Sequence, residues 1–541
     1  VFADPSIIDD PAEMADLLAP ILQQPRHELV DLMTGDGRFS VLARTVPDDV
    51  AAEVRELDLV PKGIGMFQEF ERVNPSDDLA RSIVGSVSDD GATGISGLES
   101  QLDEDLTGTP GEVTFERSKA AGGGTITGTR RDIEPARPGA DVNLTIDQVL
   151  QYEAERVLGE ALEGAGAKGG TAIISRPSTG EILALANLAE QDDGTFAPTS
   201  NNTAVTDVYE PGSVNKVVTV AAAIESGLVT PDTTMMVPDS IELGGHRFSD
   251  SHPHETTEWS VTDILATSSN VGTIMLAQQL GGARMDEFLR RFGFGTDTGL
   301  GFPAESPGIM LPAEQWAQQG TAIGSIPIGQ GVAVTALQML QAFNVLANDG
   351  TYVPPRLVRG ITGPDGEAES VPSSEHRRVV SPETAAAVRA MMAQVVERGT
   401  GQLAAVPGYS VAGKTGTARK PQGGDYEDEN GQMHYIATFA GLLPAENPDL
   451  SIIIVVDEPD PSRSIFAADV SAPAFADLAR FALRRLGIPP SAGGDISDVP
   501  DMSESAEAVD DAPVPPLPTG EDEGEGVEAS GDALVAERDG P

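Results

Sequence analysis

Residues 148–186 read QVLQYEAERVLGEALEGAGAKGGTAIISRPSTGEILALA, and this stretch decides the fold class. Its first part, Gln148–Gly166, has apolar residues at helical spacing and stops at a glycine, which predicts a helix. The apolar runs GTAIISR and GEILALA follow, and the turn-forming residues PSTG at 177–180 separate them. A helix followed by a β-hairpin predicts an α+β fold.

The rest of the chain divides into three parts by composition. Residues 1–145 are rich in Asp, Gly and Pro and hold only short strand-like and helix-like runs. Residues 146–490 continue the mixture of elements, with helices predicted at 216–227, 260–281, 335–348 and 382–398 and strands at 409–413, 435–442 and 450–456. PAFADLARFALRRLG at 473–487 predicts a closing helix. Residues 491–541 carry 15 acidic residues and one arginine, a composition that predicts a disordered tail. We therefore expect domains at 1–145 and 146–490, followed by the tail.

Charge and residue usage exclude several classes of protein. The 541 residues carry a formal net charge of −51, which repels phosphate backbones and argues against a nucleic-acid partner. The absence of cysteine from the sequence excludes disulfides, thiolate metal sites and cysteine nucleophiles. No apolar run approaches the ~18 residues of a membrane span. Because the chain starts at Val1 rather than Met, we expect that an N-terminal segment with any signal or anchor has been removed.

The first motif with candidate chemistry lies in YEPGSVNKVVTVAAAIESG, residues 209–227. Its Pro-Gly pair predicts a turn, after which Ser213 opens an apolar helix and Lys216 lies one turn further on the same face. A neutral amine at this position can act as base for the seryl hydroxyl, and the helix N-terminus adds a positive field. On its own, the motif is more typical of an N-cap serine with a solvated lysine.

Two further motifs follow along the chain. Ser268-Ser269-Asn270 fits a tight turn between two helices, with a hydroxyl and an amide available to a cleft. GKTGT follows an alternating run and offers a cation, hydroxyls and backbone N–H groups to an anionic ligand, from Lys414, Thr415, Gly416 and Thr417. Alone, these would be a polar loop and an edge strand. The sequence has only six lysines, and two of them, Lys216 and Lys414, fall in the three motifs, so we interpret the three motifs as one site.

Two other patterns suggest different chemistry. GYSVAGKT at 408–415 satisfies the phosphate-binding pattern G-x-x-x-x-G-K-[ST], but GTARKPQGG follows it where that motif requires a helix. A nucleotide site is therefore not expected. DSHPHE at 250–255 holds two histidines between carboxylates, yet a polar loop is a simpler interpretation than a metal site. We expect no metal and no cofactor.

The three motifs occur in the order Ser-x-x-Lys, Ser-x-Asn, Lys-Thr-Gly, which β-lactamases and penicillin-binding proteins share. The longer phrases EPGSVNK, SSNVG, FGFGTDTGLGFPAESPG and IPIGQGVAVTALQMLQAFNVLANDG resemble class B penicillin-binding proteins, in particular their cell-division (FtsI-like) branch. GATGISGLESQLDEDLTGTPG at 91–111 is similar to a segment of that family's N-terminal domain. ERVNP at 71–75 resembles its R-x-Y-P element, with Asn74 in place of the usual tyrosine. The resemblance covers about residues 1–485 and leaves the acidic tail unexplained.

This resemblance implies a fold and a role for each motif residue. It implies a mixed, β-rich pedestal of the penicillin-binding protein dimerisation type, followed by a transpeptidase domain with an antiparallel sheet flanked by helices. Ser213 would be the acylated nucleophile, Lys216 its base, and Ser268 a proton relay. Asn270 would hold the acyl donor and orient the lysine. The donor carboxylate would bind at Lys414 and Thr415, on the strand that continues through Gly416 and Thr417, and the N–H groups of Ser213 and Thr417 would form the oxyanion hole.

The implied activity is peptidoglycan D,D-transpeptidation in septal wall synthesis, through an acyl-serine formed on D-Ala-D-Ala and blocked by β-lactams. A D,D-carboxypeptidase or β-lactamase with the same chemistry stays open, as does a non-catalytic β-lactam or peptidoglycan sensor. The implied partners are stem peptides, a SEDS-type (FtsW-like) glycosyltransferase and other division proteins. The protein would lie at the cell membrane on an N-terminal anchor, with its catalytic domain outside. The polar loop at 420–434 is expected to be mobile and to border the cleft.

Overall fold

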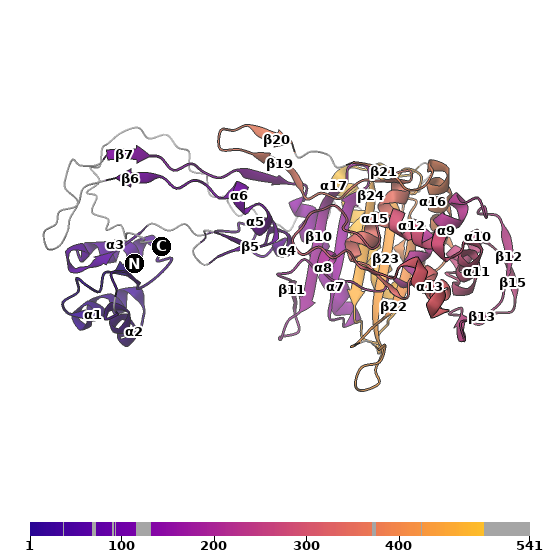
Figure 1. Cartoon of the computed structure of the whole chain (residues 1–541), viewed down its shortest axis with the longest axis horizontal. Helices are drawn as coiled ribbons and strands as arrows, with labels where there is room; N and C mark the ends of the chain where they lie inside the picture. The colour runs from indigo at the N-terminus through magenta and orange to yellow at the C-terminus, as the bar shows by residue number, and fades with distance from the viewer. Residues whose placement is uncertain are drawn as a thin grey trace.

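The computed structural model of the protein describes residues 1–35, 37–67, 72–88, 91, 93–114, 131–370, 375–423 and 425–491. The molecule is elongated, with a small helical head at one end and a large body of sheet and helices at the other (Figure 1). The segment predicted as a disordered tail lies outside the described residues, apart from Ser491.

The head comprises the first part of the chain. Its elements are α1 (Pro11–Leu22), α2 (Arg26–Met33), α3 (Asp48–Glu56), β1 (Phe2–Ala3), β2 (Ser40–Val41) and β3 (Ile64–Gly65). Asp10 caps α1 by accepting hydrogen bonds from the N–H groups of Ala12 and Glu13, both at 3.0 Å. Leu18 and Leu29 are fully buried where α1 and α2 pack together. Helices therefore supply most of the core of the head, and its three strands are two residues long.

Short strands and helices connect the head to the body. They are α4 (Arg81–Val84), β4 (Ser86–Val87), β5 (Gly94–Ser96), α5 (Gly97–Gln101), α6 (Asp103–Leu106), β6 (Glu112–Thr114), β7 (Arg131–Glu134) and β8 (Asp141–Leu144). Glu99 of α5 is buried and forms an ion pair with Arg72, so the ERVNP element holds α5 in place. Asn74 of that element is exposed, and it borders a cavity of about 240 Å³ that Leu144 and Ile146 also line.

The body begins with the predicted helix and hairpin, and the structure confirms both. They form α7 (Gln148–Ala165), β9 (Gly169–Arg176) and β10 (Glu181–Glu190), and Gly166 ends the helix with a φ of +60°. The hairpin joins a six-stranded antiparallel sheet, which confirms the predicted fold class. Its strand order is β11 (Phe196–Pro198), β10, β9, β24 (Leu450–Asp457), β23 (His434–Leu443) and β22 (Ala412–Lys420).

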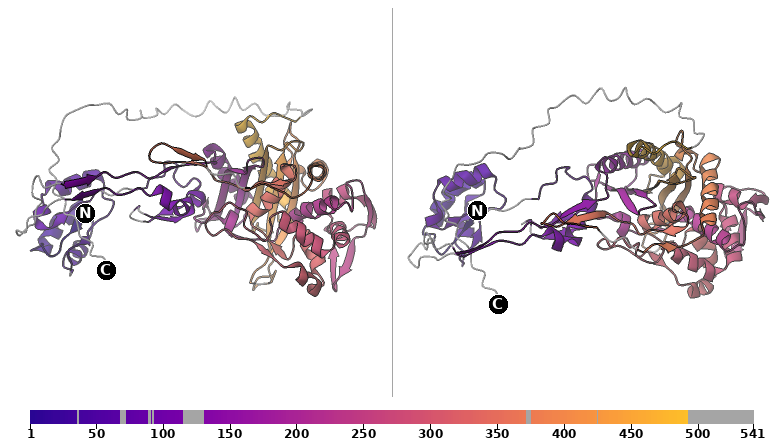
Figure 2. Two further views of the ribbon diagram at one scale, coloured as in Figure 1. Left: turned by 45° about the horizontal axis from the view of Figure 1, so that its top comes forward. Right: turned by 90° about the horizontal axis from the view of Figure 1, so that it is seen from above.

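Helices cover both faces of this sheet. Ile452 and Ile454 of β24 point toward α7 and the closing helix α17 (Ala467–Leu486), which lie side by side in Figure 2. Ile453, between them, belongs to the core on the other face. That face packs against α15 (Ala336–Ala347) and α16 (Pro382–Glu397), and α9 (Lys216–Glu225) packs against α16 in the same core. Alternating burial on both faces explains why the central strands are almost entirely apolar.

Three boundaries differ from the sequence-based expectation. The closing helix begins at Ala467 rather than Pro473, because burial of Ala472 and Phe475 holds the proline inside its early turns. Strand β22 continues to Lys420, well beyond the predicted 409–413. The helix predicted over 260–281 is two helices, α10 (Val261–Ala266) and α11 (Asn270–Leu280), with the predicted turn between them.

The remaining elements of the body lie between these. They are α8 (Thr203–Thr206), β12 (Thr234–Val237), β13 (Ser240–Leu243), β14 (His246–Ser249), β15 (Thr257–Ser260), α12 (Gly282–Arg291), β16 (Ile309–Met310), α13 (Ala313–Gln319), α14 (Ala322–Ser325), β17 (Val332–Ala333), β18 (Thr351–Tyr352), β19 (Val358–Thr362), β20 (Ala368–Ser370) and β21 (Arg377–Arg378). Strand β19 pairs with both β8 and β20. Main-chain hydrogen bonds between β8 and β19 therefore attach the end of the connecting segment to the body.

Candidate active site

Ser213 lies in a short 3₁₀ turn, η2 (Gly212–Asn215), that leads directly into α9. Side chains three residues apart eclipse each other in a 3₁₀ turn, so Ser213 and Lys216 share one face more closely than in an α-helix. The N–H of Gly212 donates to the carbonyl of Gly329 at 3.0 Å, which fixes the start of the turn. Ser213 is half-buried, and within the described ranges no hydrogen bond involves its Oγ. Its hydroxyl is therefore available to a ligand or to Lys216.

Lys216 is fully buried, and its amine is held by three acceptors. Nζ donates to Asn270 Oδ1 at 2.7 Å, to Ser268 Oγ at 3.2 Å, and to the carbonyl oxygen of Ser268. Burial lowers the pKa of Lys216 to about 7, although the nearby Asp250 carboxylate opposes the shift. A substantial fraction of this lysine is therefore neutral near physiological pH, as a general base must be.

The turn between α10 and α11 presents Ser268 to this amine. Ser268 has a φ of +60°, a left-handed conformation that is uncommon for a residue with a side chain. That conformation turns both its carbonyl and its hydroxyl toward Lys216. Asn270 is the first residue of α11, and its Nδ2 donates to the carbonyl of Ser249 at 2.9 Å. The amide orientation is thereby set, with Oδ1 toward Lys216.

Lys414 approaches the same hydroxyl from the edge strand β22. It is fully buried, and its Nζ donates to Ser268 Oγ at 2.9 Å and to the carbonyl of Thr415 at 3.0 Å. Burial, and then the charge of Lys216, lower the pKa of Lys414 well below its usual value. Two lysines thus share one hydroxyl, and the charge of either disfavours the charge of the other.

The other residues of GKTGT bring β22 against η2 (Gly212–Asn215), the turn that carries Ser213 and is called the serine turn below. Gly416 lies so close that a Cβ there would stand 2.4 Å from Val214 Cγ2 and 2.9 Å from the carbonyl of Pro211. Only glycine permits this approach. Thr415 is buried and its hydroxyl shares a 2.6 Å hydrogen bond with that of Thr400. Thr417 is half-buried, and its Oγ1 accepts from the N–H of Ala467 at 3.1 Å. The structure therefore brings the three sequence motifs together around one point.

The structure shows what the two other sequence patterns, GYSVAGKT at 408–415 and DSHPHE at 250–255, form. Thr415 lies inside a strand that continues to Lys420, where a phosphate-binding loop would need a helix. In DSHPHE, Asp250 bonds to His254 and to the α11 N-terminus rather than forming part of a metal cluster. Across the described ranges, no group of three His, Asp or Glu side chains is arranged to hold a metal ion.

The loop after β22 borders the serine turn. The Tyr426 hydroxyl donates to Glu210 Oε2 at 2.9 Å, and Glu210 Oε1 accepts from the N–H of Gly331 at 2.7 Å. Burial and the adjacent Glu210 raise the pKa of Tyr426 to about 12, so the donor stays protonated. Residue 424 lies outside the described residues, and mobility of the loop stays a prediction.

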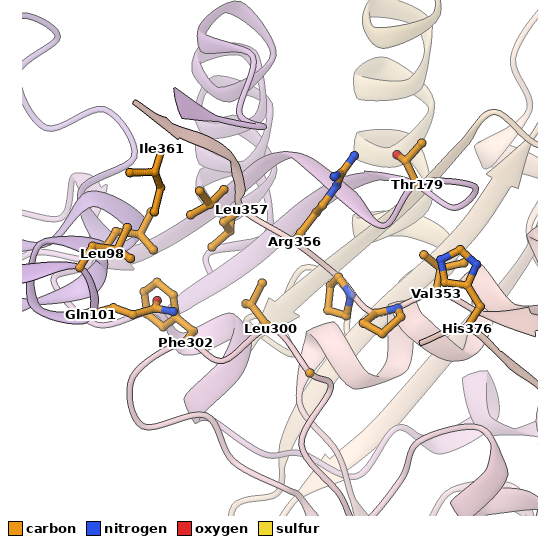
Figure 3. Close-up of a pocket in the computed structure, with 15 residues that line it drawn as sticks. Leu98, Gln101, Thr179, Leu300, Phe302, Val353, Arg356, Leu357, Ile361 and His376 are labelled. Atoms are coloured by element: carbon orange, nitrogen blue, oxygen red, sulfur yellow. The ribbon is translucent and has the colours of Figure 1, made fainter. Parts of the chain in front are cut away.

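A cavity of about 220 Å³ lies elsewhere, between α5 and the body (Figure 3). Leu98 and Gln101 line it from α5, and Leu300, Phe302 and Leu357 line it from the body. None of the eight residues predicted from sequence lines this cavity. It marks the junction between the two parts of the chain and not the site around Ser213.

Sequence reasoning missed three contributors to the site: Asp250, Thr400 and Glu210. Each has a partner at the site that lies far away in sequence: Ser269 for Asp250, Thr415 for Thr400 and Tyr426 for Glu210. The DSHPHE pattern gives no indication of the contact between Asp250 and Ser269. Glu210 precedes Ser213 by three residues, and this position in EPGS is the local signal that could have indicated it.

The sequence and the fold of the chain are similar to those of known proteins. The family described as "Penicillin binding protein transpeptidase domain" matches residues 170–480, and "Penicillin-binding Protein dimerisation domain" matches residues 1–144. The chain is 40% identical over 470 residues to penicillin-binding protein PbpB of Mycolicibacterium smegmatis, covering 83% of this chain and 70% of that protein. It is 31% identical over 508 residues to peptidoglycan D,D-transpeptidase FtsI of Escherichia coli, covering 91% and 81%.

Solved structures agree with the sequence comparison. Penicillin-binding protein 3 of Mycobacterium tuberculosis, complexed with ampicillin, is 37% identical and superposes with a TM-score of 0.69, covering 79% of this chain and 91% of that one. Its complex with aztreonam is 38% identical with a TM-score of 0.68, covering 78% and 92%. In the part of the chain that the structure describes, no helix has both the length and the apolar character needed to cross a bilayer.

Proposed function

The chain belongs to the class B penicillin-binding proteins, which are peptidoglycan D,D-transpeptidases, and from this premise we propose that Ser213 is its acylated nucleophile. The observation that carries the proposal is the hydrogen-bonded series Lys216–Ser268–Lys414, with Lys216 one turn from Ser213, whose hydroxyl has no hydrogen bond to the part of the chain that the structure describes. In this series Lys216 is a base with a pKa of about 7, and it lies one turn after Ser213.

Acylation begins when the Ser213 oxygen attacks the carbonyl carbon of the penultimate D-Ala of a stem peptide. The new bond joins Oγ to that carbon, and Lys216 Nζ accepts the hydroxyl proton. Collapse of the tetrahedral intermediate breaks the C–N bond to the terminal D-Ala. The proton passes through Ser268 Oγ to the leaving amine, a route supported by the 3.2 Å contact between Lys216 Nζ and Ser268 Oγ.

The remaining residues hold the donor in place. We assign Asn270 to the donor peptide and to the orientation of Lys216, which its 2.7 Å hydrogen bond supports. Lys414 and Thr415 bind the donor carboxylate, with Gly416 keeping the strand close and Thr417 continuing it. The N–H groups of Ser213 and Thr417 stabilise the oxyanion, an interaction that lowers such barriers by about 3–4 kcal/mol. β-Lactams mimic the donor and remain attached as acyl-enzymes.

An amine of a neighbouring stem peptide then completes the reaction. It attacks the acyl carbon while Lys216 Nζ accepts a proton from it, the bond to Ser213 Oγ breaks, and Lys216 passes that proton to the serine oxygen. No cofactor takes part in these steps. Water attack instead of amine attack would make the protein a carboxypeptidase or, with penicillin as substrate, a β-lactamase.

We also propose a septal role and the corresponding partners. Similarity to FtsI of Escherichia coli and to penicillin-binding protein 3 supports cell division. A SEDS-type (FtsW-like) glycosyltransferase would supply the glycan strands, alongside other division proteins. Because peptidoglycan lies outside the cytoplasmic membrane, the catalytic domain would face that side.

A synthetic donor ending in D-Ala-D-Ala, mixed with an amine acceptor, tests this function. We expect release of D-Ala together with an acyl-acceptor product that increases with acceptor concentration, measured by mass spectrometry. D-Ala release with only the hydrolysed donor would assign a carboxypeptidase. Rapid turnover of penicillin would assign a β-lactamase, and failure of the folded protein to react with either would leave a binding role.

A further inference from the structure

Ser249 and Asp250, at the end of β14, hold the Ser268-Ser269-Asn270 turn from a segment about 20 residues earlier. Asp250 Oδ2 accepts from Ser269 Oγ at 2.7 Å, and Oδ1 accepts from the N–H of Val271 at 2.9 Å. Ser269 in turn caps α11 by accepting from the N–H of Gly272 at 2.9 Å. The carboxylate therefore fixes the N-terminus of α11, where Asn270 begins the helix.

The imidazole of His254 completes this arrangement. Its Nε2 lies 3.0 Å from Asp250 Oδ2, and its Nδ1 lies 2.7 Å from the carbonyl oxygen of Glu255. Both ring nitrogens thus face hydrogen-bond acceptors. A neutral imidazole has only one N–H and would point a lone pair at one of these oxygens, whereas the imidazolium satisfies both. The geometry therefore favours the imidazolium form of His254.

Packing keeps this pair in position. The side chains of Asp250 and His254 are 6% and 16% exposed, so water screens the pair poorly. The ring of Trp259 lies against that of His254 with centroids 4.6 Å apart. Trp259 also packs on the small core that contains Val271 of α11. Movement of the histidine would therefore disturb the helix that carries Asn270.

The charge of Asp250 affects the pKa of Lys216. The carboxylate of Asp250 raises the pKa of Lys216 against the effect of burial. The hydrogen bonds to the Glu255 carbonyl and to Asp250 raise the pKa of His254, so its cation offsets part of the Asp250 charge. Among the described residues, Lys414, next to Lys216, also faces this network, as does Asp239, whose Oδ1 accepts from the backbone N–H of His254 at 3.3 Å.

We propose that Asp250 and His254 form a charged pair that positions the Ser268-Ser269-Asn270 turn and, through Ser268 and Asn270, the amine of Lys216. The inference rests on the proposed acylation of Ser213. Both are positioning residues, because they act through the turn and through Lys216. Loss of the carboxylate charge and loss of the imidazolium charge should shift the pH dependence of acylation in opposite directions.

The test measures the second-order rate of acylation by a fluorescent penicillin from pH 5.5 to 9. In Asp250→Asn, which keeps the shape of the side chain, we expect the rising limb to move to lower pH by about half a unit or more. In His254→Gln, whose amide still donates to Asp250, we expect it to move to higher pH with a preserved plateau. In His254→Ala, we expect the plateau itself to fall about tenfold. Glu255→Gln, which removes an exposed charge nearby, is the matched control and should not shift the limb.

Each outcome has a distinct meaning. Identical limbs for wild type, Asp250→Asn and His254→Gln would overturn the proposal, as would an equal shift in Glu255→Gln. Thermal melting of each variant identifies any that fail to fold, and His254→Gln then decides, because it retains the hydrogen bond. If wild type itself is not acylated, the proposed function fails; acylation without opposite shifts removes only this inference.

Discussion

The amine of Lys414 lies 2.9 Å from the hydroxyl of Ser268, which also accepts from the amine of Lys216 at 3.2 Å. Two buried lysines joined through one hydroxyl cannot both carry a full charge at low cost. This relationship gives a proton a direct path between Lys216, Ser268 and Lys414. It also makes the site sensitive to pH.

The acylation rate of wild type should therefore depend on pH. Since burial lowers the pKa of Lys216 to about 7, the protonated, inactive amine predominates below that pH and the neutral base above it. We expect the rate to rise about tenfold per unit below pH 6.5 and to level off above pH 8. Stopped-flow acylation with a chromogenic β-lactam measures this, and a rate independent of pH from 5.5 to 8 would contradict Lys216 as the base.

The same pKa shift predicts how Lys216 affects stability. An unfolded lysine titrates near 10.4, so between pH 7 and that value the unfolded chain binds the extra proton. The contribution of Lys216 to the free energy of unfolding should therefore rise with pH across this window and be smallest below pH 7. In Lys216→Met, denaturant titrations should show a weaker increase from pH 7 to 9 than in wild type; equal slopes would contradict the buried, largely neutral amine.

Gly416→Ala should disable the site through crowding. The added methyl would stand 2.4 Å from Val214 Cγ2 and 2.9 Å from the Pro211 carbonyl, so β22 must move away from the serine turn. We expect acylation to fall at least about a hundredfold and the free energy of unfolding to fall by about 1–3 kcal/mol.

Gly164→Ala is the matched control for that substitution. Gly164 lies in α7, where an added Cβ meets no atom within 4 Å. This change should leave acylation unaltered and raise stability by about 0.5–1 kcal/mol. Equal acylation rates for Gly416→Ala and wild type would show that the close approach of β22 is dispensable.

Tyr426→Phe should release the loop that borders the site. The substitution removes the 2.9 Å hydrogen bond to Glu210 and little else, at a cost of about 1 kcal/mol. Hydrogen exchange in 425–434 should become faster while exchange in α7 stays unchanged. Unaltered exchange in the loop would mean that this hydrogen bond does not hold it.

Much of the body could be predicted from periodicity, because its helices and central strands bury continuous apolar faces. Gln148–Ala165 forms the helix that its spacing predicts, and the hairpin after it follows. The predicted ends of helices and strands are wrong where tertiary packing outweighs the local preference of proline and glycine. Pro473 lies inside α17 because buried neighbours hold it there, and GKTGT is a strand despite two glycines because β23 pairs along its full length.

The site was predictable only in part for a related reason. Short motifs locate Ser213, Lys216 and Lys414, since each motif is local in sequence. Their mutual geometry depends on contacts between distant segments, such as Asp250 with Ser269 and Thr415 with Thr400. Spacing within a motif carries no information on such partners.

The most direct test of the central claim is covalent labelling of the full chain with a fluorescent penicillin, followed by proteolysis and mass spectrometry. We predict one stable adduct, on the peptide containing Ser213, and its loss in Ser213→Ala with an unchanged melting temperature. An adduct on another residue, or one that persists in Ser213→Ala, would contradict the assignment of Ser213 as the acylated nucleophile.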